Sequence, residues 1–141
     1  MLQRRIDAVW DVVVIYLGTN FDGNEASLRK QFDKMFEITK GVETVVLTTG
    51  EFRAAQKTVN KIIKASAAEN DHVHVLDWSS VMKLKGVTGS DKIHLSETGR
   101  AILAQTIARA LDYAPYREAD CLDPRFRDDS GIKAQSTTTN P

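Results

Sequence analysis

An aspartate and a histidine three positions apart, Asp91 and His94, carry the clearest chemical signal in the sequence. A carboxylate placed this close before a histidine can orient the imidazole and hold the tautomer that leaves its second nitrogen free as a base. A base of this kind removes the proton of a hydroxyl nucleophile, so the pair suggests acyl-transfer chemistry. Taken by itself, the same spacing also suits a simple ion pair within a loop.

No serine in the chain has the sequence context of a nucleophile. Ser79 and Ser80 follow Asp77 and Trp78 at the expected end of a strand, but they lack the glycine-flanked, strained turn that exposes a catalytic serine. A second polar turn, Gly18–Asn20, follows an apolar run, and Asn20 can serve there to shape the turn because asparagine tolerates left-handed backbone.

Composition excludes several other kinds of function. The 141 residues carry zero formal net charge, with 42% hydrophobic and 27% charged residues, so there is no basic excess for nucleic acid or an anionic membrane. The single Cys121 excludes an internal disulfide and a cysteine-based zinc cage. His72 and His74 share one face of an expected strand, but no third metal ligand is evident. We therefore predict no metal site, no cofactor and no nucleic-acid partner.

The hydrophobic spacing predicts alternating helices and strands. Helices are expected over residues 2–10, 24–40, 51–70 and from Ser96 or Thr98 to 111, and strands over 11–17, 42–48 and 73–76, with a looser region at 79–90. The run 11–17 has no polar alternation, which is typical of a strand buried on both faces of a parallel sheet. Residues 114–141 lack any period and have few apolar residues, so a disordered tail is expected there.

This order predicts a single α/β domain over residues 1–113, with a doubly wound parallel sheet. In open sheets of this kind, ligands bind beyond the C-terminal ends of the strands. The turn at 18–20, the segment 48–51 and the loop 91–94 all fall at that edge. The sequence therefore predicts that these three polar segments converge to form one site.

Together, the Gly18-Thr19-Asn20 turn and the Asp91-x-x-His94-Leu95 block resemble the SGNH (GDSL-type) hydrolase family. The longer segments Val-Val-Val-Ile-Tyr-Leu-Gly-Thr-Asn, Val-Leu-Asp-Trp-Ser-Ser and Asp-Lys-Ile-His-Leu-Ser-Glu-Thr-Gly are similar to the C-terminal SGNH domain of membrane O-acyltransferases. The resemblance covers roughly residues 5–112. It implies a flavodoxin-like three-layer fold and an esterase or O-acyltransferase acting on acyl esters of a glycan, in the first place acetyl esters.

The resemblance also implies roles for individual residues. His94 is expected to be the general base, Asp91 to orient it, and Asn20 to donate its side-chain amide to the oxyanion. Donors of that kind contribute about 10²–10³ in rate in comparable enzymes. Substrate binding is expected, by the same resemblance, at Gly18, Thr19 and Arg53.

The Gly-Asp-Ser block that carries the family's nucleophile is not found in this chain. The resemblance therefore implies a truncated domain that keeps the last three parallel strands and has little activity alone. Its expected partners are an acyl-ester or glycan substrate and a missing N-terminal segment or membrane acyltransferase domain. The family branch is extracytoplasmic or membrane-associated, but this sequence shows no signal peptide or transmembrane segment. The alternative is a non-catalytic α/β binding module, or a half-domain whose partner supplies the nucleophile strand.

Overall fold

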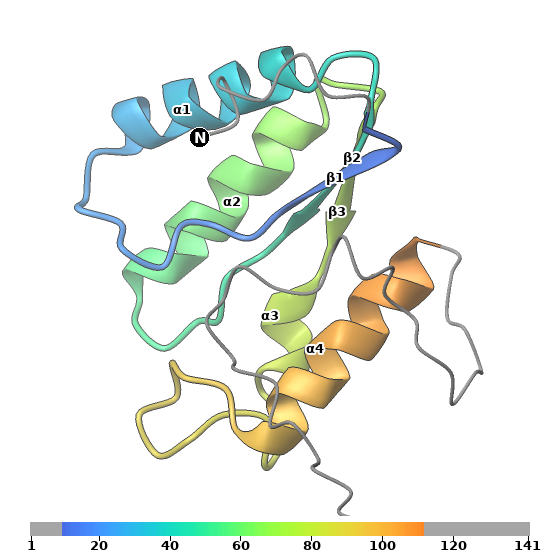
Figure 1. Ribbon diagram of the computed structural model, residues 1–141. Coiled ribbons are helices and arrows are strands. Elements are labelled where there is room, and N and C mark those ends of the chain that lie inside the picture. Colours follow the sequence, from blue (N-terminus) through green and yellow to red (C-terminus); the bar gives the residue numbers. More distant parts are fainter. Residues whose placement is uncertain (1–9, 112–141) are drawn as a thin grey trace, which may run out of the picture.

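The computed structural model of the chain describes residues 10–111 (Figure 1). The helix expected over 2–10 and the tail expected over 114–141, which includes Cys121, lie outside the described residues. The described elements are β1 (Val12–Ile15), α1 (Glu25–Ile38), β2 (Glu43–Leu47), α2 (Ala55–Ala67), β3 (Val73–Leu76), α3 (Trp78–Val81) and α4 (Glu97–Ala110).

The three strands form one parallel sheet in the order β1-β2-β3. Val14 of β1 lies opposite Val45 of β2, and Val46 of β2 lies opposite Val75 of β3. Parallel neighbours require a crossover connection, and α1 and α2 provide the two crossovers. The predicted α/β architecture with parallel strands is confirmed.

Helices cover both faces of the sheet, which gives three layers. Figure 1 shows α1 and α2 on one side of the strands and α3 and α4 on the other. The buried residues of the first core are Ile15, Phe32, Phe36, Val46, Val59, Ile63, Ala67 and Val73. Those of the second core are Val45, Leu47, Trp78, Met82 and Val87, and the partly buried face of α4 packs against them.

The expectation that the first strand is buried on both faces is wrong. β1 is shorter than predicted, and Val14 keeps 39% of its surface exposed and Tyr16, just beyond the strand, keeps 37%. The reason is that β1 is the edge strand, which within residues 10–111 pairs with β2 alone. β1 is therefore only partly buried, and an apolar run does not by itself indicate burial on both faces.

Local capping accounts for where the helices begin. α1 starts after Asn24, whose side chain accepts a hydrogen bond from the Ser27 amide at 2.9 Å. α4 starts after Ser96, one of the two expected caps, whose hydroxyl accepts a hydrogen bond from the Gly99 amide at 2.9 Å.

The region 79–90, expected to be irregular, begins with the short helix α3. No helix between residues 10 and 111 is long and apolar enough to cross a membrane.

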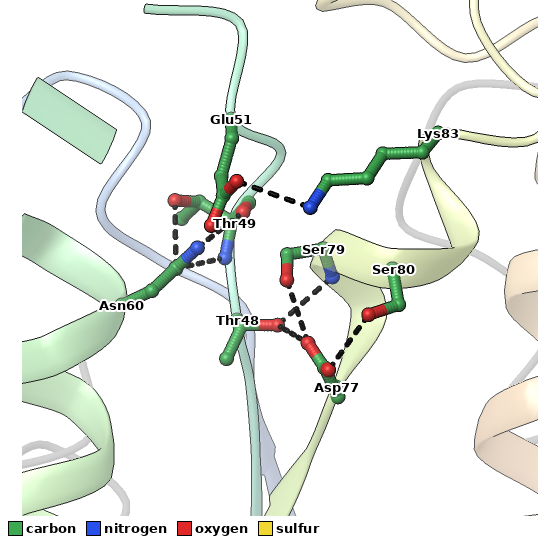
Figure 2. A network of polar contacts seen from close by, with 8 residues as sticks. All are labelled: Thr48, Thr49, Glu51, Asn60, Asp77, Ser79, Ser80 and Lys83. Atoms are coloured by element: carbon green, nitrogen blue, oxygen red, sulfur yellow. Dashed lines mark hydrogen bonds and ion pairs between the residues drawn. The ribbon is translucent and has the colours of Figure 1, made fainter. Parts of the chain in front are cut away.

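Asp77 joins the C-terminal ends of β2 and β3 to the start of α3 (Figure 2). Its carboxylate accepts hydrogen bonds from the Ser79 hydroxyl at 2.6 Å and the Ser80 hydroxyl at 2.8 Å. The Thr48 hydroxyl donates to the same carboxylate at 3.0 Å and accepts the Ser79 amide at 2.9 Å. The pKa of Asp77 is lowered to about 2, mainly by the hydrogen bond from the Ser79 hydroxyl and further by those from Ser80 and Thr48. Partial burial of the carboxyl acts in the opposite direction and raises its pKa.

We expect this carboxylate to make stability depend on pH. Because the folded-state pKa of Asp77 is depressed, its contribution is present above pH 4 and is lost as the pH falls from 4 towards 2. Asp77→Asn should therefore be less stable than the native chain near neutral pH and lose less stability on acidification. Urea unfolding at pH 6 and pH 2.5 measures both effects, with Asp71→Asn, in the turn before β3, as the control. Equal acid sensitivity of Asp77→Asn and the native chain would contradict the assignment.

Candidate functional site

Asp91 and His94 form a close side-chain pair in the loop that precedes α4. His94 Nδ1 lies 2.6 Å from Asp91 Oδ2. The second carboxylate oxygen accepts the backbone amides of Ile93 at 2.9 Å and of His94 at 3.0 Å. Asp91 therefore fixes both the backbone and the imidazole of the same histidine.

The protonation state of Asp91 determines the tautomer of His94. The hydrogen bond from the His94 side chain, and then the amides of Ile93 and His94, lower the pKa of Asp91 to about 2. An ionised carboxylate can only accept, so in the neutral ring Nδ1 carries the proton and Nε2 is an acceptor. The His94 side chain is 85% exposed, and Nε2 has no hydrogen-bond partner among residues 10–111. The geometry provides an oriented and accessible base.

Backbone contacts hold this loop against the body of the domain. Thr88 and Leu95 form an isolated antiparallel bridge, and the Gly89 amide donates to the His94 carbonyl at 2.8 Å. The Ser96 amide donates to the Val87 carbonyl at 3.0 Å. Lys92, between the two members of the pair, has a φ of 58°. The loop is thus a closed turn in which Asp91 and His94 lie at the tip.

Two of the three polar segments that were predicted to converge, those at 18–20 and 91–94, contribute to one open cleft of about 740 Å³, whereas no residue of the segment 48–51 lines it. The cleft is lined by Tyr16, Thr19, Asn20, Phe21, Phe52, Arg53, Ile93, His94 and Leu95. It therefore brings together loops that follow β1 and β2 and the loop before α4. The Asn20 side chain forms no hydrogen bond to another described residue, so its amide can meet a ligand in this cleft.

Arg53 acts on the neighbouring loop rather than projecting freely into the cleft. Its guanidinium donates to the Phe21 carbonyl at 2.9 Å and to the Thr19 carbonyl at 3.3 Å. Gln56, fully buried on α2, orients the guanidinium at 3.1 Å and donates to the Gly18 carbonyl at 3.1 Å. These contacts give Arg53 a positioning role for the turn that carries Asn20, and Arg53 also lines the cleft, where the resemblance predicts substrate binding.

Gly18 has a packing role in the same turn. Its φ is +112°, and a Cβ atom added there would lie 2.7 Å from Val59 Cγ1 of α2. Only glycine allows the turn both this backbone conformation and this closeness to α2. The Gly18 and Thr19 positions thus set the path of the chain into Asn20.

The sequence did not single out several residues that line the site or support it from below. Gln56 is hidden among the polar residues of a helix, and nothing in its spacing indicates that it reaches the loop after β1. Tyr16, Phe52 and Leu95 give the cleft its apolar walls. Burial raises the pKa of the Tyr16 hydroxyl, and the nearby Trp78 indole opposes this effect without completing a hydrogen bond. Tyr16 belongs to an apolar run whose sequence indicated burial, so no signal in the sequence pointed to its place in the cleft.

No hydroxyl nucleophile is placed at His94. Within residues 10–111, no serine or threonine hydroxyl is hydrogen-bonded to His94 Nε2. Ser79 and Ser80, the serines weighed as nucleophiles, both donate to Asp77. The site in the described chain therefore contains a base and an amide donor, without the group that the base would activate.

The two other histidines have separate protein partners. His72 Nε2 lies 3.0 Å from the Phe36 carbonyl, and His74 Nε2 lies 2.6 Å from Glu43 Oε2. In the part of the chain that the structure describes, no group of three or more His, Cys, Asp or Glu residues is placed to hold a metal ion.

No protein-family model matches the chain, and no curated protein matches it.

Proposed function

We propose that this chain is the C-terminal part of an SGNH-type domain, a serine esterase or O-acyltransferase acting on acyl esters of a glycan. The observation that carries the proposal is the Asp91–His94 pair: within residues 10–111 its Nε2 has no hydrogen-bond partner, and it shares a cleft with the Asn20 amide, which has no partner among those residues either. A base and an oxyanion donor on different loops of one cleft are two of the three groups that acyl transfer requires, the third being the nucleophile. The order of the blocks along the chain supports the same family.

In the proposed reaction, His94 Nε2 accepts the proton of an attacking hydroxyl as its oxygen bonds to the ester carbonyl carbon. Asp91 stabilises the resulting imidazolium, and the amide of Asn20 donates to the oxyanion. Collapse of the tetrahedral intermediate breaks the bond to the leaving alkoxide, which takes the proton from His94. Water or a sugar hydroxyl then accepts the acyl group from the nucleophile in a second step of the same kind.

The nucleophile is proposed to come from a segment that pairs with the outer edge of β1. That edge bears no further strand within residues 10–111, and it leads directly into the turn that holds Asn20. A second cleft, of about 440 Å³, lies between the segment 16–21, which follows β1, and α1, and it shares Tyr16, Thr19, Asn20 and Phe21 with the first. A strand added here would end beside the cleft that contains His94.

Co-expression with a separate fragment tests the proposal. The fragment is the N-terminal half of an SGNH esterase, two βα units that include its Gly-Asp-Ser block. We expect this chain alone to hydrolyse 4-nitrophenyl acetate no faster than its His94→Ala variant, and the pair to hydrolyse it and to label with a fluorophosphonate on the fragment serine. A fragment in which that serine is alanine is the matched control. Labelling of a serine in this chain, or a stable pair without turnover, would contradict the proposal.

A second candidate is a non-catalytic glycan-binding module. The absence of a hydroxyl at His94 Nε2 within the described residues favours it. Acetylated and deacetylated glycan oligomers distinguish the two functions, because a module that recognises the ester binds the acetylated form more tightly and never cleaves it. Turnover in the co-expressed pair would exclude this candidate.

A further inference from the structure

A third cleft, of about 440 Å³, adjoins the one that contains His94, and its lining includes three lysines and one glutamate. Phe52 lines both clefts. Lys92 lines the third cleft, and the next residue, Ile93, lines the cleft of His94. A ligand that extends past Phe52 from the His94 cleft would therefore enter the third cleft.

The charge of this cleft is only partly compensated. Lys83 lies 3.1 Å from Glu51, which lowers the pKa of that carboxyl, and Figure 2 shows this pair beside the Thr49–Asn60 contact. Lys85 and Lys92 form no ion pair with any residue between 10 and 111. Three lysines and one glutamate thus line the cleft, and two of the three lysines have no ion-pair partner among the described residues.

The backbone at Lys92 adds a second, independent observation. Its φ of 58° is left-handed, a conformation in which glycine and asparagine are common and a long side chain is uncommon. Asp91 imposes this turn by accepting the amides of Ile93 and His94. The turn that orients His94 therefore also places Lys92 in the lining of the adjoining cleft, at a position where glycine or asparagine would be less strained.

The third cleft also has apolar surface. Leu84 is 59% exposed at its border, and Met82 packs under Gly50, where an added Cβ would lie 2.6 Å from the Met82 sulfur. Free cations beside an apolar wall suit an organic anion better than a bare inorganic ion.

We propose that this cleft binds a carboxylate or phosphate group of the ligand whose acyl ester lies at His94, which makes the ligand an acidic glycan. The ester's place at His94 rests on the proposed function. The binding of the anion depends only on Lys85 and Lys92 and can be measured without any reaction.

Calorimetric titration of the full chain with three sugars tests the proposal. The sugars are a galacturonate tetramer, a neutral galactose tetramer of the same length, and a phosphorylated galactose oligomer. We expect the two anionic sugars to bind at least about tenfold more tightly than the neutral one, with an advantage that shrinks as salt screens the charges. The order of the two anions identifies the preferred group. Equal binding of all three sugars, or no binding of any, would overturn the proposal.

Charge-matched variants locate the binding. Lys85→Gln combined with Lys92→Asn removes both open cations, and asparagine tolerates the left-handed backbone at position 92. The control, Lys30→Gln with Lys34→Gln on α1, makes the same change in net charge on exposed positions away from the cleft. We expect the first pair alone to lose the preference for anions. If the control loses as much, the effect is a general one of net charge and the site is wrong. If the co-expression assay fails while the preference for anionic sugars remains, the proposed esterase activity is wrong and the proposed anion site stands.

Discussion

Asp91→Asn is expected to lower the turnover of the co-expressed pair by about 10⁴-fold, with the fold of this chain unchanged. The carbonyl oxygen of the new amide can still accept the backbone amides of Ile93 and His94, as Asp91 Oδ1 does. The amide nitrogen takes the place of Asp91 Oδ2, which in the native chain lies 2.6 Å from His94 Nδ1. An amide nitrogen can only donate a hydrogen bond. Nδ1 must become the acceptor, the proton moves to Nε2, and the base is lost.

The change of tautomer can be measured on this chain alone. Two-bond ¹H–¹⁵N spectra distinguish a protonated from an unprotonated ring nitrogen, and we expect a protonated Nδ1 in the native neutral His94 and a protonated Nε2 in Asp91→Asn. This readout is independent of the missing nucleophile, so it separates an error in the geometry from an error in the proposed reaction. An unchanged tautomer in Asp91→Asn would refute the positioning role of Asp91.

The chain contains a matched control for this substitution. Glu43 and His74 form another exposed carboxylate–histidine pair at 2.6 Å, on neighbouring strands and outside the cleft. Glu43→Gln makes the same chemical change there. We expect it to alter the local environment of His74 and to leave turnover of the co-expressed pair unchanged. An equal loss of turnover in both variants would point to a general effect on the fold.

Gly99→Ala is expected to produce the largest loss of stability of any glycine-to-alanine substitution within residues 10–111. Gly99 is the one buried residue of α4, and an added Cβ would overlap the Val87 carbonyl oxygen and lie 2.8 Å from the Val87 carbonyl carbon. The obstacle is backbone, which cannot rotate aside as a side chain could. α4 must therefore shift away from residue 87, and we expect a loss of at least about 3 kcal/mol in the free energy of unfolding.

Gly99→Ala should also disturb the site, because the segment between Val87 and α4 carries the loop of Asp91 and His94. The Ser96 amide bonds to the Val87 carbonyl, so displacing α4 breaks the closure of that loop. Denaturant unfolding measures the stability. Gly89→Ala is the control, since its Cβ would meet only ordinary contacts, the nearest being the His94 carbonyl oxygen at 3.7 Å. Unfolding midpoints that coincide for Gly99→Ala and Gly89→Ala would show that α4 is not held where the structure has it.

Much of the fold could be predicted because its determinants are local. The spacing of Phe32 and Phe36 places both on the buried face of α1, and the β-branched residues of β2 give a strand buried along most of its length. The Asp91–His94 contact is local as well, because a turn closes it over three residues. Short-range sterics and hydrogen bonds decide such features, and the sequence displays them directly.

The sequence by itself thus determined the parallel α/β alternation, the three polar loops and the paired acid and base. Tertiary structure alone decided what those loops contact: Arg53 and Gln56 reach across more than thirty positions to the turn that carries Asn20, and Lys85 and Lys92 gather in a cleft beside His94. It also decided that β1 is an edge strand and that Gly99 is where α4 meets residue 87. The physical reason is that these contacts follow from how helices pack on the sheet, and no periodicity along the chain encodes which residue of one element meets which residue of another.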